Sequence, residues 1–496
     1  MAPSEGTTPS ERYLAQLCRR CFLSLWSYPN LYTDEGKHGS GDGRELCDLL
    51  VAFGDDVLIF SDKHIEFSDS GNLDVDWKRW FRRAVMKSAD QLHGAEKWLR
   101  KYPNRIYLDR QCTKPFPLPL PHPERARYHR IAVTRGSSDA CVRYYGYQGT
   151  RSLRISTDTQ SSSPFTIGRV QPDKPYVHVL DEFTLDVVLH ELDTIYDLVA
   201  YLRKKEHLLT NQNRMIVASG EEQLLAIYLT NLNAEGDHDI VLPHDAMTAD
   251  GIMFDEGFWE DMVRDPRYAA KKQADQVSYA WDSLIEQFIK YASPRTVGIE
   301  IDIGTGPSYM EHALRVMAGE PRLRRRQLGD ALIDAIRTRN GKRLARLVMS
   351  NDYPDNAYIF LVLPNKEKLS YDEYRRHRVT LLWAYCKVAK LRAPHAKYVV
   401  GIALDSPDPE RPGGSEDLVY LDVHDWTVDH AAEARNLQQE LGLLRDDNVR
   451  FRHTNMAEYP VASAAEPYKT AAPKPRTPLN RAQRRALAAQ SRKKRK

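Results

Sequence analysis

Two apolar runs joined by a tight polar turn dominate the pattern of the first part of the chain. The runs extend from Glu45 to Phe53 and from Asp56 to Ser61, with Gly54 opening the turn between them. Such a pattern predicts a β-hairpin. Apolar residues recur at helical spacing before it, from about Ser10 to Ser27, and after it, from Trp77 to Lys101. A helix is therefore expected on each side of the hairpin.

Two further strands are expected after the second helix in the sequence, a short one from Arg105 to Leu108 and a longer one from Tyr128 to Thr134. The order helix, hairpin, helix and strand predicts a small α/β unit with helices covering its sheet. Mixed helix and strand patterns continue beyond it. The chain is thus expected to be α/β and to divide into a first unit (1–150), a linker or long loop (151–175), a mixed α/β middle region (176–350), a C-terminal α/β domain (351–466) and a basic, disordered tail (467–496).

Composition favours a globular protein of the cytoplasm. The chain has 496 residues, of which 42% are hydrophobic and 28% charged, which is enough for two or three cores. No apolar run is long enough to span a bilayer, and the first ten residues lack the basic and apolar regions of a secretory signal. The six cysteines show no framework spacing, which fits a reducing compartment.

The basic tail is the clearest electrostatic signal in the sequence. It holds ten Lys and Arg and no acid from Lys474 to Lys496, so the rest of the chain is mildly acidic. Such a segment favours salt-dependent, sequence-independent binding of nucleic acid, and the alternative is a solubilising terminus. The nucleic-acid-binding residues expected here are Arg481, Arg484, Arg485, Arg492, Lys493, Lys494, Arg495 and Lys496.

The polar residues of the hairpin are the main candidates for chemistry. Asp48 lies in the first strand, and Asp62 and Lys63 follow at the end of the second. Carboxylates brought together in this way can hold a hard cation that polarises a phosphodiester. The alternative is a solvated hairpin edge with an ion pair, because Asp and Lys are ordinary beside turns.

From about Ser10 to Thr134 the chain resembles the PD-(D/E)XK nuclease superfamily, with Asp48 in the first strand of a hairpin, a turn, and Lys63 at the end of the second strand. The resemblance implies a restriction-endonuclease-like fold and Mg²⁺ or Mn²⁺ bound by Asp48 and an acid near Asp62. It also implies that Lys63 orients or activates the attacking water. A bacterial role in defence against foreign DNA, or in repair, is consistent with this resemblance.

The second acid of the family pattern is missing, since Ser61 stands two residues before Lys63. Strict alternation places Ser61 and Lys63 on one face of the strand and Asp62 on the other. Three alternatives follow. A bulge after Phe60 turns Asp62 inward, another acid such as Glu11 or Glu45 replaces it, or catalysis is lost.

Gln91 is a further candidate because it lies eleven residues after Trp80, about three helical turns, on or beside the apolar face of the helix. Some nucleases of this superfamily use a glutamine on the helix after the lysine strand, so the resemblance implies that Gln91 lies near the metal. The alternative is a glutamine hydrogen-bonded to the backbone. Two other acidic and histidine-containing segments, His190 to Asp193 and Asp237 to Asp239, have no partner at metal-ligand spacing.

These observations predict a metal-dependent nuclease that hydrolyses phosphodiester bonds of DNA or RNA. The alternative from another class is a nucleic-acid-binding or scaffold protein that keeps a nuclease-like fold without catalysis. Both imply nucleic acid as the partner and no membrane, and an oligomer or a partner protein is compatible with either.

Overall fold

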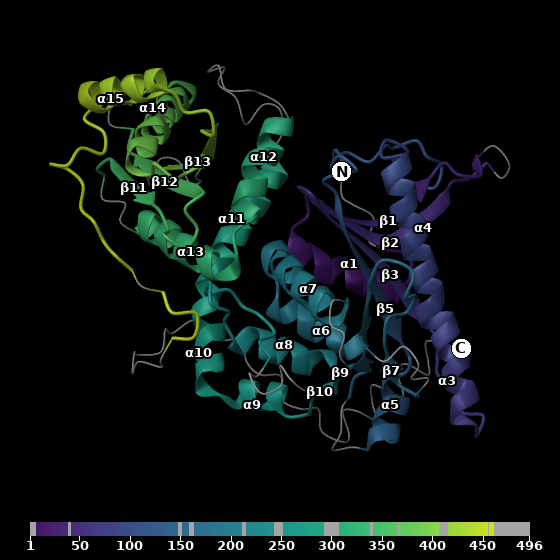
Figure 1. Cartoon of the computed structure of the whole chain (residues 1–496). Helices are drawn as coiled ribbons and strands as arrows, with labels where there is room; N and C mark the ends of the chain where they lie inside the picture. Colours follow the sequence, from purple (N-terminus) through teal and green to yellow (C-terminus); the bar gives the residue numbers. More distant parts are fainter. Residues whose placement is uncertain are drawn as a thin grey trace, which may run out of the picture.

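A computed structural model shows a mixed α/β protein, with three sheets among the residues it describes (Figure 1). The structure describes residues 6–37, 41–146, 151–157, 163–210, 215–242, 251–291, 307–337, 341–365, 368–405, 415–454 and 456–460. Apolar residues alternate from Val297 to Ile303, a pattern that predicts a strand, but this run lies outside the described residues, as does the basic tail.

The first sheet has six strands in the order β4-β1-β2-β3-β5-β8. Neighbours are antiparallel from β4 to β3 and parallel from β3 to β8. Its strands are β1 (Ser27–Thr33), β2 (Arg44–Phe53), β3 (Asp56–His64), β4 (Ile106–Tyr107), β5 (Arg127–Arg135) and β8 (Val177–Asp181). The expected hairpin is present as β2 and β3. Strand β1, which was not expected, begins at Ser27, where the predicted helix ends.

Helices cover both faces of this sheet. One face packs against α1 (Pro9–Phe22), whose buried residues share a core with Leu58 and Phe60 of β3. The other packs against a long helical segment whose residues share a core with Val57 and Ile59. That segment consists of α3 (Leu73–Phe81), a π-helical turn η1 (Arg82–Met86) and α4 (Lys87–Lys101). Alternate residues of β3 therefore face opposite helices.

The second sheet has four strands in the order β10-β9-β6-β7. Its strands are β6 (Arg154–Ser156), β7 (Thr166–Ile167), β9 (Met215–Ala218) and β10 (Gly251–Phe254). The helices of this part of the chain are α5 (Ser138–Tyr145), α6 (Glu182–Glu191), α7 (Ile195–Thr210), α8 (Glu221–Thr230), α9 (Phe258–Arg264) and α10 (Pro266–Asp275). The segment expected to be a linker thus contributes two strands, and β8 extends the first sheet past residue 150.

The third sheet has the order β11-β12-β13-β14 and lies far from α3 and α4 (Figure 1). Its strands are β11 (Leu344–Val348), β12 (Asn356–Leu363), β13 (Tyr398–Asp405) and β14 (Glu416–Asp422). The crossover helix α14 (Tyr371–Arg392) joins the parallel pair β12 and β13. The remaining helices of this part are η3 (Gln276–Ser278), α11 (Tyr279–Tyr291), α12 (Pro307–Ala318), α13 (Arg322–Arg337) and α15 (Val428–Leu441).

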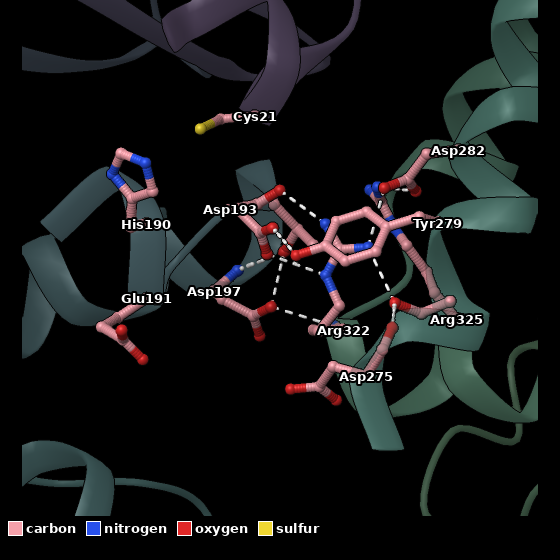
Figure 2. Close-up of polar contacts among 12 residues, drawn as sticks. Cys21, His190, Glu191, Asp193, Asp197, Asp275, Tyr279, Asp282, Arg322 and Arg325 are labelled. Carbon is pink, nitrogen blue, oxygen red and sulfur yellow. Dashed lines mark hydrogen bonds and ion pairs between the residues drawn. The ribbon is translucent and has the colours of Figure 1, made fainter. Parts of the chain in front are cut away.

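A buried ionic network ties α13 to α11 and to the turn between α6 and α7 (Figure 2). The Arg322 guanidinium donates to Asp193 Oδ1 at 2.8 Å and to Asp282 Oδ2 at 2.7 Å. Arg325 donates to the other oxygen of Asp282 at 2.7 Å, and the Tyr279 hydroxyl donates to Asp193. All four charged residues are less than 10% exposed. The basic stretch that begins at Arg322 is therefore part of the interior.

Among the described helices, none is long and apolar enough to cross a membrane.

Candidate active site

The hairpin opens at Asp48. The ladder between β2 and β3 runs from the turn to the pair Leu49 and Phe60. Beyond that pair, the backbone N–H of Asp62 donates to a side chain in place of a backbone carbonyl. Its acceptor is Asp48 Oδ2, at 2.6 Å. On its other side β3 keeps a regular parallel register with β5 as far as His64. A bulge after Phe60, one of the three alternatives for Asp62, is thus not seen in that pairing.

Asp48 and Lys63 lie together, as the sequence predicted. Lys63 Nζ is 3.8 Å from Asp48 Oδ2, and the side chain of Asp48 is 4% exposed while that of Lys63 is 31% exposed. Burial raises the pKa of Asp48 to about 6, although Lys63 and the Asp62 amide lower it and the nearby charges of Glu45 and Glu11 raise it further. The site is therefore a buried carboxylate beside an amine that reaches solvent.

The Asp62 side chain points away from this pair. Its carboxylate is fully buried and accepts the Arg135 Nε–H at 3.0 Å, on the face of the sheet where Phe60 packs with α1. Burial raises the pKa of Asp62, and the Arg135 guanidinium opposes that rise. The structure therefore brings the backbone of Asp62, and not its carboxylate, to Asp48.

Ser61 and Gln91 are in direct contact. The Ser61 hydroxyl lies 3.0 Å from Gln91 Oε1 and 3.3 Å from the Ser88 hydroxyl, and Ser61 is completely buried. Gln91 thus meets the hairpin at the position where the family pattern has its second acid. Its place on the helix has a structural explanation, since its side-chain oxygen accepts a hydrogen bond from a buried hydroxyl.

Glu11 and Glu45 meet through Asn30, a residue that sequence reasoning did not single out. Asn30 Nδ2 lies 3.0 Å from Glu11 Oε2 and 3.5 Å from Glu45 Oε1. Glu11 also closes the capping box of α1 with Thr8. Burial raises the pKa of Glu11, but hydrogen bonds from Asn30 and from the backbone N–H groups of Thr7 and Thr8 outweigh it, so that pKa is lowered.

The backbone of β1 explains how Asn30 reaches both acids. Asn30 has φ of 51°, and the register of β1 against β2 shifts just beyond it, between Leu31 and Tyr32. Asn adopts this left-handed conformation more readily than most residues. By register it lies opposite Asp48, between the pairs Pro29 with Leu49 and Leu31 with Cys47. The Pro-Asn dipeptide was the available signal, but it indicated the end of a helix rather than a distorted strand.

Within the part of the chain that the structure describes, no three His, Cys, Asp or Glu side chains form a group that could hold a metal ion as they stand. The two other acidic segments are engaged elsewhere. His190 contacts the Asp186 carbonyl and Asp193 binds Arg322 (Figure 2), while His238 contacts Glu458 at 2.7 Å. The eight tail residues expected to bind nucleic acid, from Arg481 onward, lie outside the described residues.

Comparison of the chain with protein-family models, with curated proteins and with solved structures found no match.

Proposed function

We propose that the N-terminal unit is a metal-dependent nuclease that hydrolyses phosphodiester bonds of DNA or RNA. The observation that carries the proposal is the pairing of buried Asp48 with Lys63 where the hairpin opens, with Lys63 Nζ and Asp48 Oδ2 3.8 Å apart. The elements around the pair support it. Helix α1, the hairpin β2–β3, the helical segment α3–α4 and a strand β5 parallel to β3 follow in the order that the PD-(D/E)XK resemblance implies.

Asp48, Glu45 and Glu11 would offer carboxylate oxygens, which are the ligand type that Mg²⁺ and Mn²⁺ prefer. Glu11 and Glu45 share the Asn30 amide, and both raise the pKa of Asp48. Neighbouring carboxylates repel one another when they are ionised, and a cation bound between them stabilises their ionised forms. We therefore assign the second and third ligands to Glu45 and Glu11, in place of Asp62, which is bound to Arg135.

The chain's own groups then have distinct tasks. A bound divalent cation lowers the pKa of its water and offsets charge on the attacked phosphate. The Asp62 amide fixes the Asp48 carboxylate, which must be ionised to act as a ligand. Lys63 presents its ammonium from a partly exposed position, where it can orient a water and neutralise a phosphate oxygen. A cytoplasmic location is part of the proposal and rests on the sequence composition. A role in bacterial defence or in repair is also part of it and rests on the family resemblance alone.

The direct test is cleavage of labelled DNA and RNA by the purified full chain with Mg²⁺, with Mn²⁺ and with EDTA. Asp48→Asn, Glu45→Gln and Lys63→Met should each lower the rate by at least about a hundredfold, which is the scale of a lost charge-stabilising group. Glu66→Gln is the matched control, because Glu66 follows the same strand and its side chain is 83% exposed. Cleavage that survives Asp48→Asn would refute the assignment.

A second candidate is a nucleic-acid-binding protein without catalysis. The observation that favours it is the pairing of Asp62 with Arg135, which leaves buried Ser61 where the family has an acid. Binding of nucleic acid that does not depend on divalent ions, together with no cleavage in either metal, would favour this candidate.

A further inference from the structure

A cation-rich surface lies along the helical segment α3–η1–α4, which packs against β3. Residues 78–87 include five Lys or Arg and no acid, and all five side chains are exposed. Within the described residues none of the five takes part in a hydrogen bond or ion pair through its side chain. We call this set the basic face; its members are Lys78, Arg79, Arg82, Arg83 and Lys87.

The basic face differs from several other cations of this unit, which have acidic partners. Arg100 and Arg130 bind Glu96, and Arg127 binds Asp56. Five unpaired cations within ten residues repel one another, and that cost is offset when an anion of matching extent lies against them.

The basic face is anchored beside the candidate active site. The Ser88 hydroxyl contacts Ser61, and the Trp80 indole N–H donates to the Ile65 carbonyl at 2.8 Å. These two contacts fasten the helical segment to β3 on either side of Lys63. Because Lys63 alternates with Ser61, its side chain lies on the sheet face that this segment covers. The π-helical turn η1 lies between the anchors, and π-turns are frequent at functional positions.

We propose that the basic face binds the phosphate backbone of duplex nucleic acid and guides it toward Lys63, an inference that rests on the proposed function. The five residues extend about 13 Å along the helix, a length that matches about four phosphates of one strand. The aromatic residues of α3 support a duplex over a single strand. Trp77 and Trp80 are 4% and 1% exposed, so they offer no platform on which unpaired bases could stack.

Two double variants test this surface while removing the same charge. Arg82→Gln with Arg83→Gln removes two members of the basic face, and Lys97→Gln with Lys101→Gln removes two exposed cations from the far end of the same helical segment. Binding is measured by fluorescence anisotropy on the full chain carrying Asp48→Asn, in EDTA, over a range of salt. The probes are a duplex, a single strand and vesicles rich in anionic lipid.

The first double variant should weaken duplex binding several-fold and reduce the slope of log K against log salt by about 2, since each lost phosphate contact removes about 0.9. The second should leave both values near those of the parent. The proposal would be overturned if duplex affinity fell equally in the two variants, or did not fall in the first. It would also be overturned if the chain bound the single strand more tightly than the duplex, or bound the vesicles in place of the duplex. Because the assay needs no cleavage, its outcome is independent of the nuclease test.

Discussion

The backbone N–H of Asp62 donates to the Asp48 carboxylate at 2.6 Å, so Asp48 continues the hairpin where the backbone ladder ends. This contact gives Asp48 a structural role beside its proposed catalytic one. The two roles differ in what they require of the side chain. An acceptor oxygen suffices for the hairpin, whereas a metal ligand must also carry charge.

Asp48→Asn separates the two roles. The pKa of Asp48 is about 6 against 3.8 for the free residue, so its ionised form opposes folding above pH 6. The shift corresponds to at most about 3 kcal/mol at neutral pH. The amide oxygen of Asn keeps the acceptor without the charge. We therefore expect the variant to be more stable than the parent in urea denaturation at pH 8, by up to that amount, and inactive. Equal or lower stability would contradict the cost assigned to the Asp48 charge.

The pH dependence of metal binding follows from the same pKa. Without metal, Asp48 is protonated below about pH 6, and protons then compete with the cation. The affinity for Mn²⁺ should fall steeply as the pH decreases from 7 to 5, and isothermal titration calorimetry at several pH values measures it. Asp48→Asn should bind Mn²⁺ weakly at every pH. An affinity that is flat over this range would remove Asp48 from the ligand set.

Local pattern predicted much of this fold. The predicted hairpin strands and the strand predicted from Tyr128 to Thr134 agree with the structure to within a few residues, because alternation and turn residues define them without outside help. The strand β1 was missed because its conformation depends on the Asn30 distortion and on pairing with β2 and β4. Such pairing is nonlocal and leaves no periodic signal.

The site was predictable only in part, for a similar reason. Asp48 and Lys63 approach each other because hairpin register places them together, and register can be inferred from the turn. The partner of Asp62 is Arg135, 73 residues away on a parallel strand. Its identity depends on how β5 aligns with β3, which the sequence does not reveal.

Ser61→Asp should strengthen metal binding. The new carboxylate would lie beside Asp48 at a completely buried position, next to Gln91, where an uncompensated charge is costly. We expect a lower melting temperature without metal and a larger stabilisation by Mn²⁺ than in the parent chain, measured by differential scanning fluorimetry. Ser61→Asn is the control of equal size without charge. A Mn²⁺ response that is the same in both variants would exclude position 61 from the metal site.

The buried network of Figure 2 should be sensitive to loss of a single acid. Asp282 accepts from both Arg322 and Arg325, so Asp282→Ala leaves two buried guanidinium groups short of a partner. The expected loss in the free energy of unfolding is about 3–5 kcal/mol. Asp261→Ala is the comparison, because Asp261 and Arg264 form an exposed pair, and such pairs contribute about 1 kcal/mol or less. Urea denaturation measures both, and similar losses would show that the network is not a major source of stability.

The contact between His238 and Glu458 should stabilise the protein more at low pH than at high pH. Burial lowers the pKa of His238, but its 2.7 Å contact with Glu458 and the charge of Asp197 outweigh that effect, so the pKa is raised. A histidine with a raised pKa contributes stability that is complete below about pH 6.5 and is lost as the pH rises through its value in the folded state. Glu458→Gln should therefore destabilise the protein more at pH 6 than at pH 9.

Some destabilisation by Glu458→Gln should remain at pH 9, because Lys271 lies 3.7 Å from the Glu458 carboxylate and keeps its charge there. The midpoint of urea denaturation at the two pH values measures the difference. Glu440→Gln, an exposed change on α15, controls for the loss of one negative charge. A penalty for Glu458→Gln that is equal at pH 6 and pH 9 would mean that Lys271 alone binds Glu458 and that His238 remains neutral in the folded protein.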